Sequence, residues 1–314
     1  MYENVEMRKI LCDELEKLMD KNEKIVVMDA DLANAMGTLP LRDKYPERAF
    51  DVGIAEQNMA AMAAGMSAYG FIPFISTFTA FATRRICDQI CVSIAYAKRN
   101  VKILGGDPGI AAQLNGGTHM SLDDIGILRS IPDMVIFEPV DGVQLAKALP
   151  KIVEHYGPVY IRLFRKVAPV IFKDDYEFDL FKADILKEGK DVTLFATGIM
   201  VEEALKAADK LKEEEIEAEV INIHTIKPID KEAVINSAKK TRAVVTCENH
   251  NVIGGLKSAV SEVLIEECPV SLKGIGTQDH CGEVGKIDFL MKKYHMTWED
   301  IASAARETIN KKNK

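Results

Sequence analysis

A glycine turn that joins a short strand to an apolar helix is the feature of this sequence that most constrains its fold. Gly53 follows the segment 48–52, and Glu56 comes just before a run of small apolar residues at 59–66. Because a helix that is apolar almost all round has no face for water, we expect this helix to be buried. Glu56 should then lie on its first turn, at the carboxyl edge of a sheet, where open α/β sheets bind ligands. The alternative is a carboxylate that only complements the positive end of the helix.

Strand-like and helix-like segments alternate along the first half of the chain. Strands are predicted at residues 24–28, 71–76, 101–104, 134–137 and 159–163. Helices are predicted at residues 1–21, 56–69, 78–98, 121–129 and 141–155. This spacing is typical of βαβ units, so we predict a doubly wound, mainly parallel sheet. Pro73 indicates an edge position, or the first position, for its strand.

The alternation stops at residues 166–190, which are rich in Asp, Lys and Phe and show no clear period. We predict that they link a first domain, residues 1–165, to a smaller α/β domain, residues 191–314. Strands of the second domain are predicted at residues 191–196, 218–223, 243–247 and 270–274. Its helices are predicted at residues 200–214 and 230–239, after Gly254-Gly255, and around Phe289 and Trp298. The charged end, residues 311–314, is expected to fray.

Composition argues against several classes of function. The formal net charge of −8 disfavours a nucleic-acid or anionic-membrane partner. No apolar run approaches the roughly 20 residues of a membrane span. The acidic N-terminus lacks the apolar core of a signal peptide, so we expect a cytoplasmic protein. The six cysteines form no Cys-x-x-Cys pair and are expected to be reduced thiols rather than zinc ligands.

Four stretches of the first domain place polar or aromatic residues where a ligand could bind. Besides Glu56, Phe78 and Phe81 are spaced i, i+3 and are predicted to share one face of a helix. His119 follows a glycine-rich loop, and Arg165 comes just past the end of a strand. Taken singly, each has an ordinary interpretation: core packing for the two rings, a loop position for His119, and a solvated charge for Arg165.

Together these stretches resemble the transketolase family of thiamine-diphosphate enzymes. The resemblance extends from about residue 8 to residue 305 and is strongest at residues 51–81, 117–119 and 129–134. The second domain is similar to the C-terminal domain of that family through Glu248-Asn249-His250 and residues 294–301. The order and spacing of these motifs along one chain are more specific than any one of them.

The resemblance implies a thiamine-diphosphate cofactor and a role for each candidate residue. Glu56 would hydrogen-bond the aminopyrimidine ring and activate its amino group, which serves as the base. Phe78 and Phe81 would pack against that ring, because flat rings stack well on aromatic faces. Asp31 matches a family aspartate at the cofactor pocket. His119 would hydrogen-bond a substrate hydroxyl or carbonyl group and is a candidate to relay a proton.

The implied reaction is transfer of a two-carbon ketol unit from a ketose phosphate to an aldose phosphate, as in the pentose phosphate branch of carbohydrate metabolism. Arg8 and Arg165 match arginines that bind the substrate phosphate, a task suited to a guanidinium group. The sequence departs from the family at three places. Asn115 replaces an aspartate that contacts a substrate hydroxyl, Asp107 aligns near a phosphate-binding histidine, and a phosphate-binding serine is missing near residues 34–35. An anion in place of a cation beside a phosphate costs Coulomb energy, so we expect the donor or the acceptor to differ from the usual sugar phosphates.

The magnesium-diphosphate motif of the family is not found in this sequence. In the family an N-terminal domain binds Mg²⁺ and the diphosphate through a Gly-Asp-Gly motif, whereas here Gly106-Asp107 is followed by Pro108. Magnesium needs oxygen ligands besides those of the diphosphate, and no cluster in the sequence offers them. The resemblance therefore implies that a separate N-terminal transketolase subunit holds Mg²⁺ or Ca²⁺. It also implies that this chain dimerises within an α₂β₂ heterotetramer that binds sugar phosphates.

Three alternatives share part of this pattern. The β-subunit of a 2-oxo-acid dehydrogenase E1 component has a similar motif at Glu56, a split architecture and the same cofactor. Residues 117–119 and 129–132 fit transketolase better. A single-chain deoxyxylulose-phosphate synthase would carry the diphosphate-binding domain as well. A non-catalytic partner that kept the fold would tolerate Glu56→Gln without loss of activity in the complex.

Overall fold

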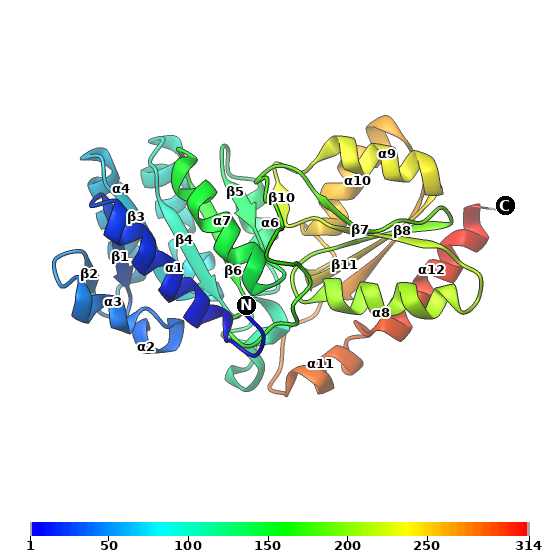
Figure 1. Cartoon of the computed structure of the whole chain (residues 1–314), viewed down its shortest axis with the longest axis horizontal. Helices are drawn as coiled ribbons and strands as arrows, with labels where there is room; N and C mark the ends of the chain where they lie inside the picture. The colour runs from blue at the N-terminus through cyan, green and yellow to red at the C-terminus, as the bar shows by residue number, and fades with distance from the viewer. Residues whose placement is uncertain (1, 313–314) are drawn as a thin grey trace.

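The computed structural model describes residues 2–312 and forms two α/β lobes side by side (Figure 1). The N-terminal lobe is built on a 7-stranded sheet and the C-terminal lobe on a 5-stranded sheet. Helices cover both faces of the first sheet, so the predicted doubly wound, mainly parallel domain followed by a smaller α/β domain is confirmed. The predicted fraying of the last residues falls partly on 313–314, outside the described residues. The last helix, α12 (Trp298–Lys312), includes Lys311 and Lys312.

The first sheet has the strand order β10-β5-β6-β4-β3-β1-β2. Its strands are β1 (Ile25–Asp29), β2 (Ala49–Asp51), β3 (Ile72–Phe78), β4 (Lys102–Gly106), β5 (Val135–Phe137), β6 (Val159–Leu163) and β10 (Thr225–Lys227). Neighbours run parallel except β10, which pairs antiparallel with β5. The carboxyl ends of β1, β3 and β4 therefore meet at one edge of the sheet. The prediction for Pro73 is wrong, because it is the second residue of β3, an internal strand.

Two apolar layers hold helices against the first sheet. On one face, α1 (Met7–Lys21) and α7 (Gly142–Glu154) lie side by side and share an apolar cluster with Ile25 and Val27 of β1 (Figure 1). On the other face, α4 (Glu56–Ala68), η2 (Gln89–Tyr96) and α6 (Asp124–Arg129) share an apolar cluster with Val26 and Met28. Alternate residues of β1 thus point to opposite faces, as the pleat requires. Two short helices, α2 (Ala33–Met36) and α3 (Leu39–Lys44), connect β1 to β2.

The continuous helix predicted at residues 78–98 is wrong. Phe78 ends β3, and the segment then divides into α5 (Thr79–Ala82), η1 (Arg84–Ile86) and the π-helical η2. Thr79 Oγ1 donates a hydrogen bond to the Gly106 carbonyl oxygen at 2.9 Å, and Thr83 Oγ1 donates to that of Thr79 at 2.7 Å. Such side-chain bonds compete with regular helix. Phe78 and Phe81 therefore do not share a helix face, although their ring centroids are 6.5 Å apart.

The expectation that α4 is buried all round is also wrong for this chain. Met59, Ala60 and Ala63 face the sheet, whereas Ala61, Met62 and other residues are exposed on the opposite side. The helix has small residues on both sides, but only one side can reach the sheet. The other side presents small and apolar residues to the surface.

The second sheet has the strand order β12-β11-β8-β9-β7, parallel except for β7. Its strands are β7 (Asp184–Lys187), β8 (Val192–Ala196), β9 (Ala218–Asn222), β11 (Ala243–Asn251) and β12 (Ser271–Thr277). Its helices are α8 (Met200–Lys212), α9 (Lys231–Thr241), α10 (Leu256–Glu267), α11 (Ile287–Lys293) and α12. The stretch 166–190 contains β7, and β11 extends past residue 247 through Glu248-Asn249-His250. The boundaries at 165 and 191 stay a prediction.

The two lobes are joined by buried contacts as well as by the connecting chain. β10 comes from the second half of the sequence, yet Ile226 is buried among side chains of the first lobe. Arg162 of β6 is fully buried and pairs with Asp124 and Glu138, each at 2.7 Å. Its Nη2 donates to the Asn249 carbonyl oxygen of β11 at 2.6 Å. Hydrogen bonds are stronger in such a low-dielectric interior, so this network ties the lobes together.

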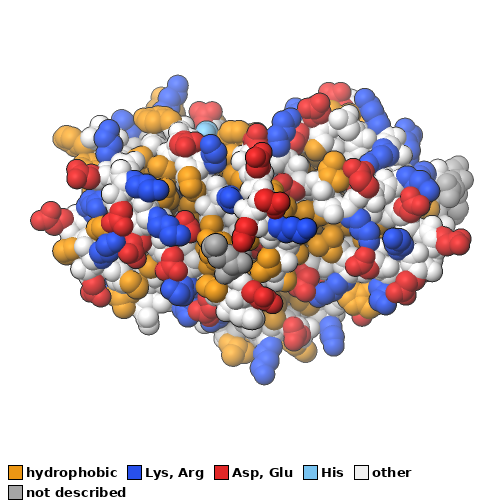
Figure 2. All heavy atoms as spheres, in the orientation of Figure 1, with side chains coloured by type: hydrophobic (Ala, Val, Ile, Leu, Met, Phe, Trp, Pro, Cys, Tyr) orange, Lys and Arg blue, Asp and Glu red, His pale blue; other side chains and the backbone are white. Residues whose placement is uncertain are grey.

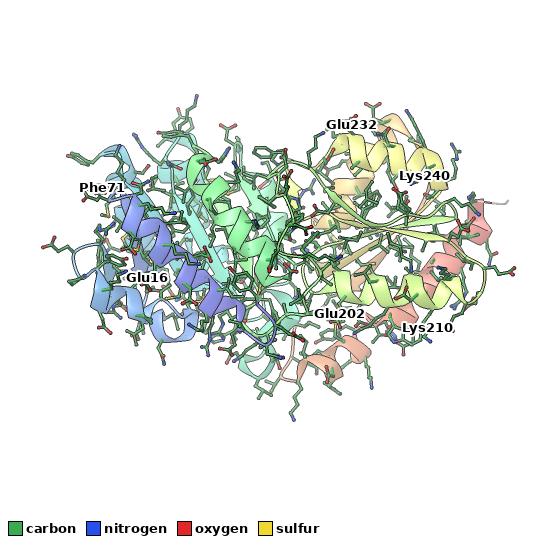
Figure 3. The ribbon with its side chains drawn as sticks, viewed as in Figure 1. Glu16, Phe71, Glu202, Lys210, Glu232 and Lys240 are labelled. Carbon is green, nitrogen blue, oxygen red and sulfur yellow. The ribbon has the colours of Figure 1, made fainter. Side chains whose placement is uncertain are left out.

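The surface gives no sign of a single large charged patch on the face drawn in Figure 2. Acidic and basic side chains are interspersed there, and the outline is hollowed at the upper margin where the lobes meet (Figure 2). Figure 3 labels four charged residues of the second lobe: Glu202, Lys210, Glu232 and Lys240. Within residues 2–312, no helix is both long enough and apolar enough to cross a membrane.

Candidate active site

Glu56 is the first residue of α4, and it is 4% exposed. The turn before it depends on Gly53, which has φ +75°, a conformation that glycine adopts readily. The Asp51 carboxylate stabilises this turn by accepting hydrogen bonds from the backbone N–H of Gly53 at 2.6 Å and of Asp31 at 3.1 Å. The short strand and the glycine turn thus place a buried carboxylate at the carboxyl edge of the sheet.

The Glu56 carboxylate pairs with Arg85, a residue that sequence reasoning missed. Arg85 Nη1 donates to Oε1 and Oε2 of Glu56 at 3.0 and 3.2 Å. The guanidinium carbon lies 4.4 Å from the centroid of the Phe81 ring. Arg84, its neighbour, points to Asp123 instead, at 3.6 Å. Nothing in the sequence distinguishes the two adjacent arginines, because the irregular η1 turn decides which of them reaches Glu56.

His119 reaches the two phenylalanine rings across the loop that precedes it. Its ring is nearly edge-on to both, with centroids 5.9 Å from Phe78 and 5.1 Å from Phe81. Thr118 Oγ1 lies 3.0 Å from His119 Nδ1. The fold therefore brings together residues that are far apart in the sequence. We call Glu56, Phe78, Phe81, Arg85 and His119 the ring site.

Arg165 and Asp107 form a buried ion pair beside the ring site. Asp107 accepts hydrogen bonds from the Arg165 backbone N–H at 3.2 Å and from Nη2 at 2.5 Å. The Arg165 guanidinium lies 4.8 Å from the centroid of the Phe78 ring. Its Nε is buried and has no hydrogen-bond partner among residues 2–312. Arg165 thus keeps one unused donor although a carboxylate already binds it.

Arg8 and Arg165 converge on one backbone carbonyl. Both donate to the oxygen of Ala35, Arg8 from Nη1 at 3.1 Å. Arg8 also pairs with Glu6 at 2.7 Å, where both side chains are partly exposed. The two arginines predicted to bind the substrate anion are therefore neighbours, and each has its own carboxylate. We call Arg8, Asp107 and Arg165 the arginine site.

Asp31 and Asn115 are exposed, and their side chains form no hydrogen bond or ion pair with another described residue. The fold does not bind them to the ring site. Asp29, two residues before Asp31, is the buried carboxylate of this strand end. Burial raises the pKa of Asp29 to about 6, and a hydrogen bond from Thr38 Oγ1 at 2.8 Å offsets part of that effect. Asp29 follows a run of apolar residues, and this pattern did not indicate that its carboxylate is buried.

The ring site fits the aminopyrimidine of thiamine diphosphate. The Phe81 face and the Glu56 carboxylate already hold one flat group with N–H donors, the Arg85 guanidinium. An aminopyrimidine needs the same pair, a surface to stack on and a carboxyl group to hydrogen-bond. Residues 2–312 place no cluster of three or more His, Cys, Asp or Glu side chains that could hold a metal ion. The described residues thus suit the ring end of the cofactor better than its magnesium-diphosphate end.

Comparison with known proteins shows which family combines these features. Residues 3–170 match the pyrimidine-binding domain of transketolase, and residues 181–301 match the transketolase C-terminal domain. The chain therefore belongs to the transketolase family, which confirms the resemblance seen in its motifs.

Several relatives are parts of split transketolases. The chain is 53% identical to the 6-deoxy-6-sulfo-D-fructose transketolase subunit SqwH of Clostridium sp. (strain MSTE9), over 98% of this chain and 95% of that protein. It is 36% identical to an apulose-4-phosphate transketolase subunit of Phocaeicola vulgatus, over 97% of each. Human transketolase is 31% identical over 98% of this chain but only 50% of its own length.

A solved structure agrees with these relatives. A split-gene transketolase described as an inactive beta4 tetramer superimposes with a TM-score of 0.89 at 42% identity, covering 98% of this chain and 99% of that one. The chain is thus similar along nearly its whole length to proteins described as transketolase subunits or as a split-gene transketolase.

Proposed function

We propose that this chain is the pyrimidine-binding subunit of a two-subunit, thiamine-diphosphate-dependent transketolase. We further propose that its ketose donor ends in a singly charged anion, such as the sulfonate of 6-deoxy-6-sulfo-D-fructose. The observation that carries the proposal is the ring site. There the Glu56 carboxylate and the face of the Phe81 ring hold one planar group, the Arg85 guanidinium. The relatives named as transketolase subunits support it.

The residues of this chain divide the work of ketol transfer. When bound, thiamine diphosphate supplies the carbon nucleophile that carries the two-carbon unit. Glu56 would hydrogen-bond N1′ of the aminopyrimidine, and Phe78 and Phe81 would pack on the ring and exclude water. His119, at the edge of both rings, would bind a substrate hydroxyl and move its proton.

The overall reaction balances without an oxidant or a reductant. The C2–C3 bond of the ketose breaks, and a carbon–carbon bond forms between the two-carbon unit and the aldehyde carbon of the acceptor. The proton that leaves the C3 hydroxyl of the donor is matched by one gained by the new hydroxyl of the product. We assign the transfer of that proton to His119, and its position at the edge of the Phe78 and Phe81 rings supports this role.

The carboxylate in the arginine site supports the proposal of a singly charged anion. Asp107 is buried beside Arg165, so water screens its charge only weakly. A phosphate monoester carries about −1.5 to −2 charges at neutral pH, whereas a sulfonate carries one. Repulsion from Asp107 is therefore larger for the phosphate. The unused Nε of Arg165 remains as a donor for an anionic oxygen.

The proposed assembly is a heterotetramer in which a partner subunit supplies the magnesium-diphosphate site and this chain forms a self-dimer. The exposed apolar side of α4, with Ala61 and Met62, supports a contact between chains at that helix. The related split-gene structure, described as a tetramer, supports self-association.

The test is to purify the chain with its partner and to identify that partner by mass spectrometry. Ketol transfer is then measured with 6-deoxy-6-sulfo-D-fructose, fructose 6-phosphate and xylulose 5-phosphate as donors. We expect activity that requires thiamine diphosphate and both proteins, with kcat/KM for the sulfonate donor at least about tenfold above the others. Best activity with xylulose 5-phosphate and ribose 5-phosphate would contradict the substrate class. Decarboxylation of a 2-oxo acid would identify the dehydrogenase alternative instead.

A further inference from the structure

The loop that carries His119 is packed into the second domain, although both of its ends belong to the first. This loop, residues 107–119, follows β4 and contains the 3-10 helix η3 (Gly109–Asn115). Ile110 and Ala112 of the loop are buried in the core of the second domain, together with Met120 and Leu122 just after it. Because burial of apolar side chains is the main force that orders a core, the loop takes its position from the second domain.

Asn249 of β11 binds the start of this loop through both the nitrogen and the oxygen of its side-chain amide. Its Nδ2 donates to the Pro108 carbonyl oxygen at 2.8 Å, and its Oδ1 accepts from the Ile110 backbone N–H at 2.9 Å. Asn249 is fully buried. The two bonds need a side chain that carries a donor and an acceptor in one plane. The amide group of asparagine provides both.

Glycines let the loop approach the second domain closely. Gly109, between the two residues bound by Asn249, has φ +54°, and a Cβ there would lie 2.2 Å from Asn249 Oδ1. At the far end of the loop, a Cβ on Gly117 would lie 2.4 Å from the carbonyl oxygen of Gly282. There is no room for a side chain at either position. Both ends of the loop are therefore set against backbone or buried side chains of the second domain.

We propose that the second domain sets the geometry of the substrate side of the catalytic site, and that Asn249 is a positioning residue that acts through the 107–119 loop. This inference rests on the proposed function, because Asp107, Asn115 and His119 are the loop residues assigned to the substrate. Asn249 has no hydrogen bond with Glu56, Phe78 or Phe81. Glu56, Phe78 and Phe81 lie outside the loop, and His119 meets the two rings only at their edges. Loss of the two bonds should therefore lower kcat/KM far more than it weakens cofactor binding.

The test compares Asn249→Ala with a matched variant, Asn222→Ala, in the full chain assembled with its partner subunit. Asn222 on β9 is equally buried, and its amide binds Asp184 and Gln144 rather than the loop. Hydrogen–deuterium exchange of residues 109–119 is measured first. Then kcat/KM for the ketose donor and the Kd of thiamine diphosphate are measured for each complex.

In Asn249→Ala we expect exchange in the loop to become at least about tenfold faster, because its local opening is no longer opposed. We expect kcat/KM to fall on the order of 10²-fold through misplacement of the loop, with the Kd of thiamine diphosphate within about twofold of wild type. Asn222→Ala is expected to lower the melting temperature and to leave loop exchange unchanged.

The inference would be overturned if the loop of Asn249→Ala exchanged at the wild-type rate. It would also be overturned if Asn249→Ala and Asn222→Ala lost the same amount of kcat/KM. Asn249→Leu gives the same measurement if Asn249→Ala does not fold, because leucine keeps the branched shape of the side chain and can form neither hydrogen bond. Unchanged loop exchange in Asn249→Leu would also overturn the inference. Absence of ketol transfer in the wild-type complex would contradict the proposed function. The exchange rates of the loop would still show whether Asn249 holds it in place.

Discussion

The guanidinium of Arg85 lies 3.0 Å from the carboxylate of Glu56 and covers the face of the Phe81 ring. A cofactor ring that stacks on Phe81 and hydrogen-bonds Glu56 needs the same space. On the proposed binding mode, Arg85 has to leave this position when thiamine diphosphate binds. The Arg85 side chain is 46% exposed, so water solvates the guanidinium as it moves out.

Arg85→Ala is expected to tighten the binding of thiamine diphosphate to the assembled complex. A partly exposed ion pair contributes about 0–1 kcal/mol, and an exposed cation–π contact contributes about 0.5–1 kcal/mol. Removing both should lower the Kd by about two- to thirtyfold, measured by calorimetry. Arg84→Ala is the matched control, because that arginine pairs with Asp123 and not with Glu56. Weaker binding in Arg85→Ala would show that Arg85 holds the ring instead of competing with it.

Glu56→Gln is expected to reduce kcat by about 10²–10⁴-fold, the range for loss of a positioned proton-transfer group. Assembly should be unchanged, because glutamine has nearly the same volume and keeps one oxygen that can accept from Arg85. The measurements are steady-state kinetics and analytical ultracentrifugation of the complex. Full activity in this variant would identify the chain as a non-catalytic partner.

Asp107→Asn is expected to shift the preference for the donor toward phosphate. The change removes the buried negative charge and keeps an oxygen for the Arg165 backbone N–H. The ratio of kcat/KM for fructose 6-phosphate to that for 6-deoxy-6-sulfo-D-fructose should rise at least about tenfold, equal to about 1.4 kcal/mol.

Glu6→Gln is the control for that prediction, because Glu6 is the carboxylate that pairs with Arg8 of the same site. The Glu6 side chain is 33% exposed, and water screens exposed charges, so the ratio should change by less than about threefold. A ratio that is unchanged in Asp107→Asn would exclude Asp107 as the residue that discriminates between the anions.

Glu248 should make stability depend on pH. Burial raises the pKa of Glu248 to about 8, although the backbone N–H groups of Lys257 and Leu256 favour the charged form. Between about pH 5 and pH 8 the unfolded carboxyl has lost its proton and the folded one keeps it. The free energy of unfolding therefore falls as the pH rises through this window, by at most about 1.4 kcal/mol per unit. In Glu248→Gln, urea unfolding should show a shallower slope over this range, and equal slopes in the two proteins would contradict the assignment.

The sequence predicts the part of the site that depends on regular structure. Parallel strands end at a common edge, so residues just after them are neighbours in space although they are far apart in the chain. The resemblance to the transketolase family assigned Glu56, Phe81 and His119 to one site, and the common edge explains how residues so far apart in the chain come together. The glycine turn at Gly53 is a local signal and placed α4 correctly.

What the sequence does not predict depends on irregular or very short elements. Arg85 reaches Glu56 because the helix ends before Thr83 and an irregular turn follows. Two adjacent arginines show no periodicity that would predict which of them does so. β7 and β10 have four and three residues, too few to show an alternation. Asp107 was expected to disturb the binding of an anion, but its ion pair with Arg165 depends on side-chain placement at two separate strand ends.

The strand β10 has a consequence for any attempt to divide or recombine this protein. Residues 225–227 pair with one edge of β5, so a fragment that stops within residues 166–190 would leave that edge unpaired. Unpaired strand edges promote aggregation. A chimera that grafts the second half of one relative onto the first half of another would have to match this short strand to its recipient sheet.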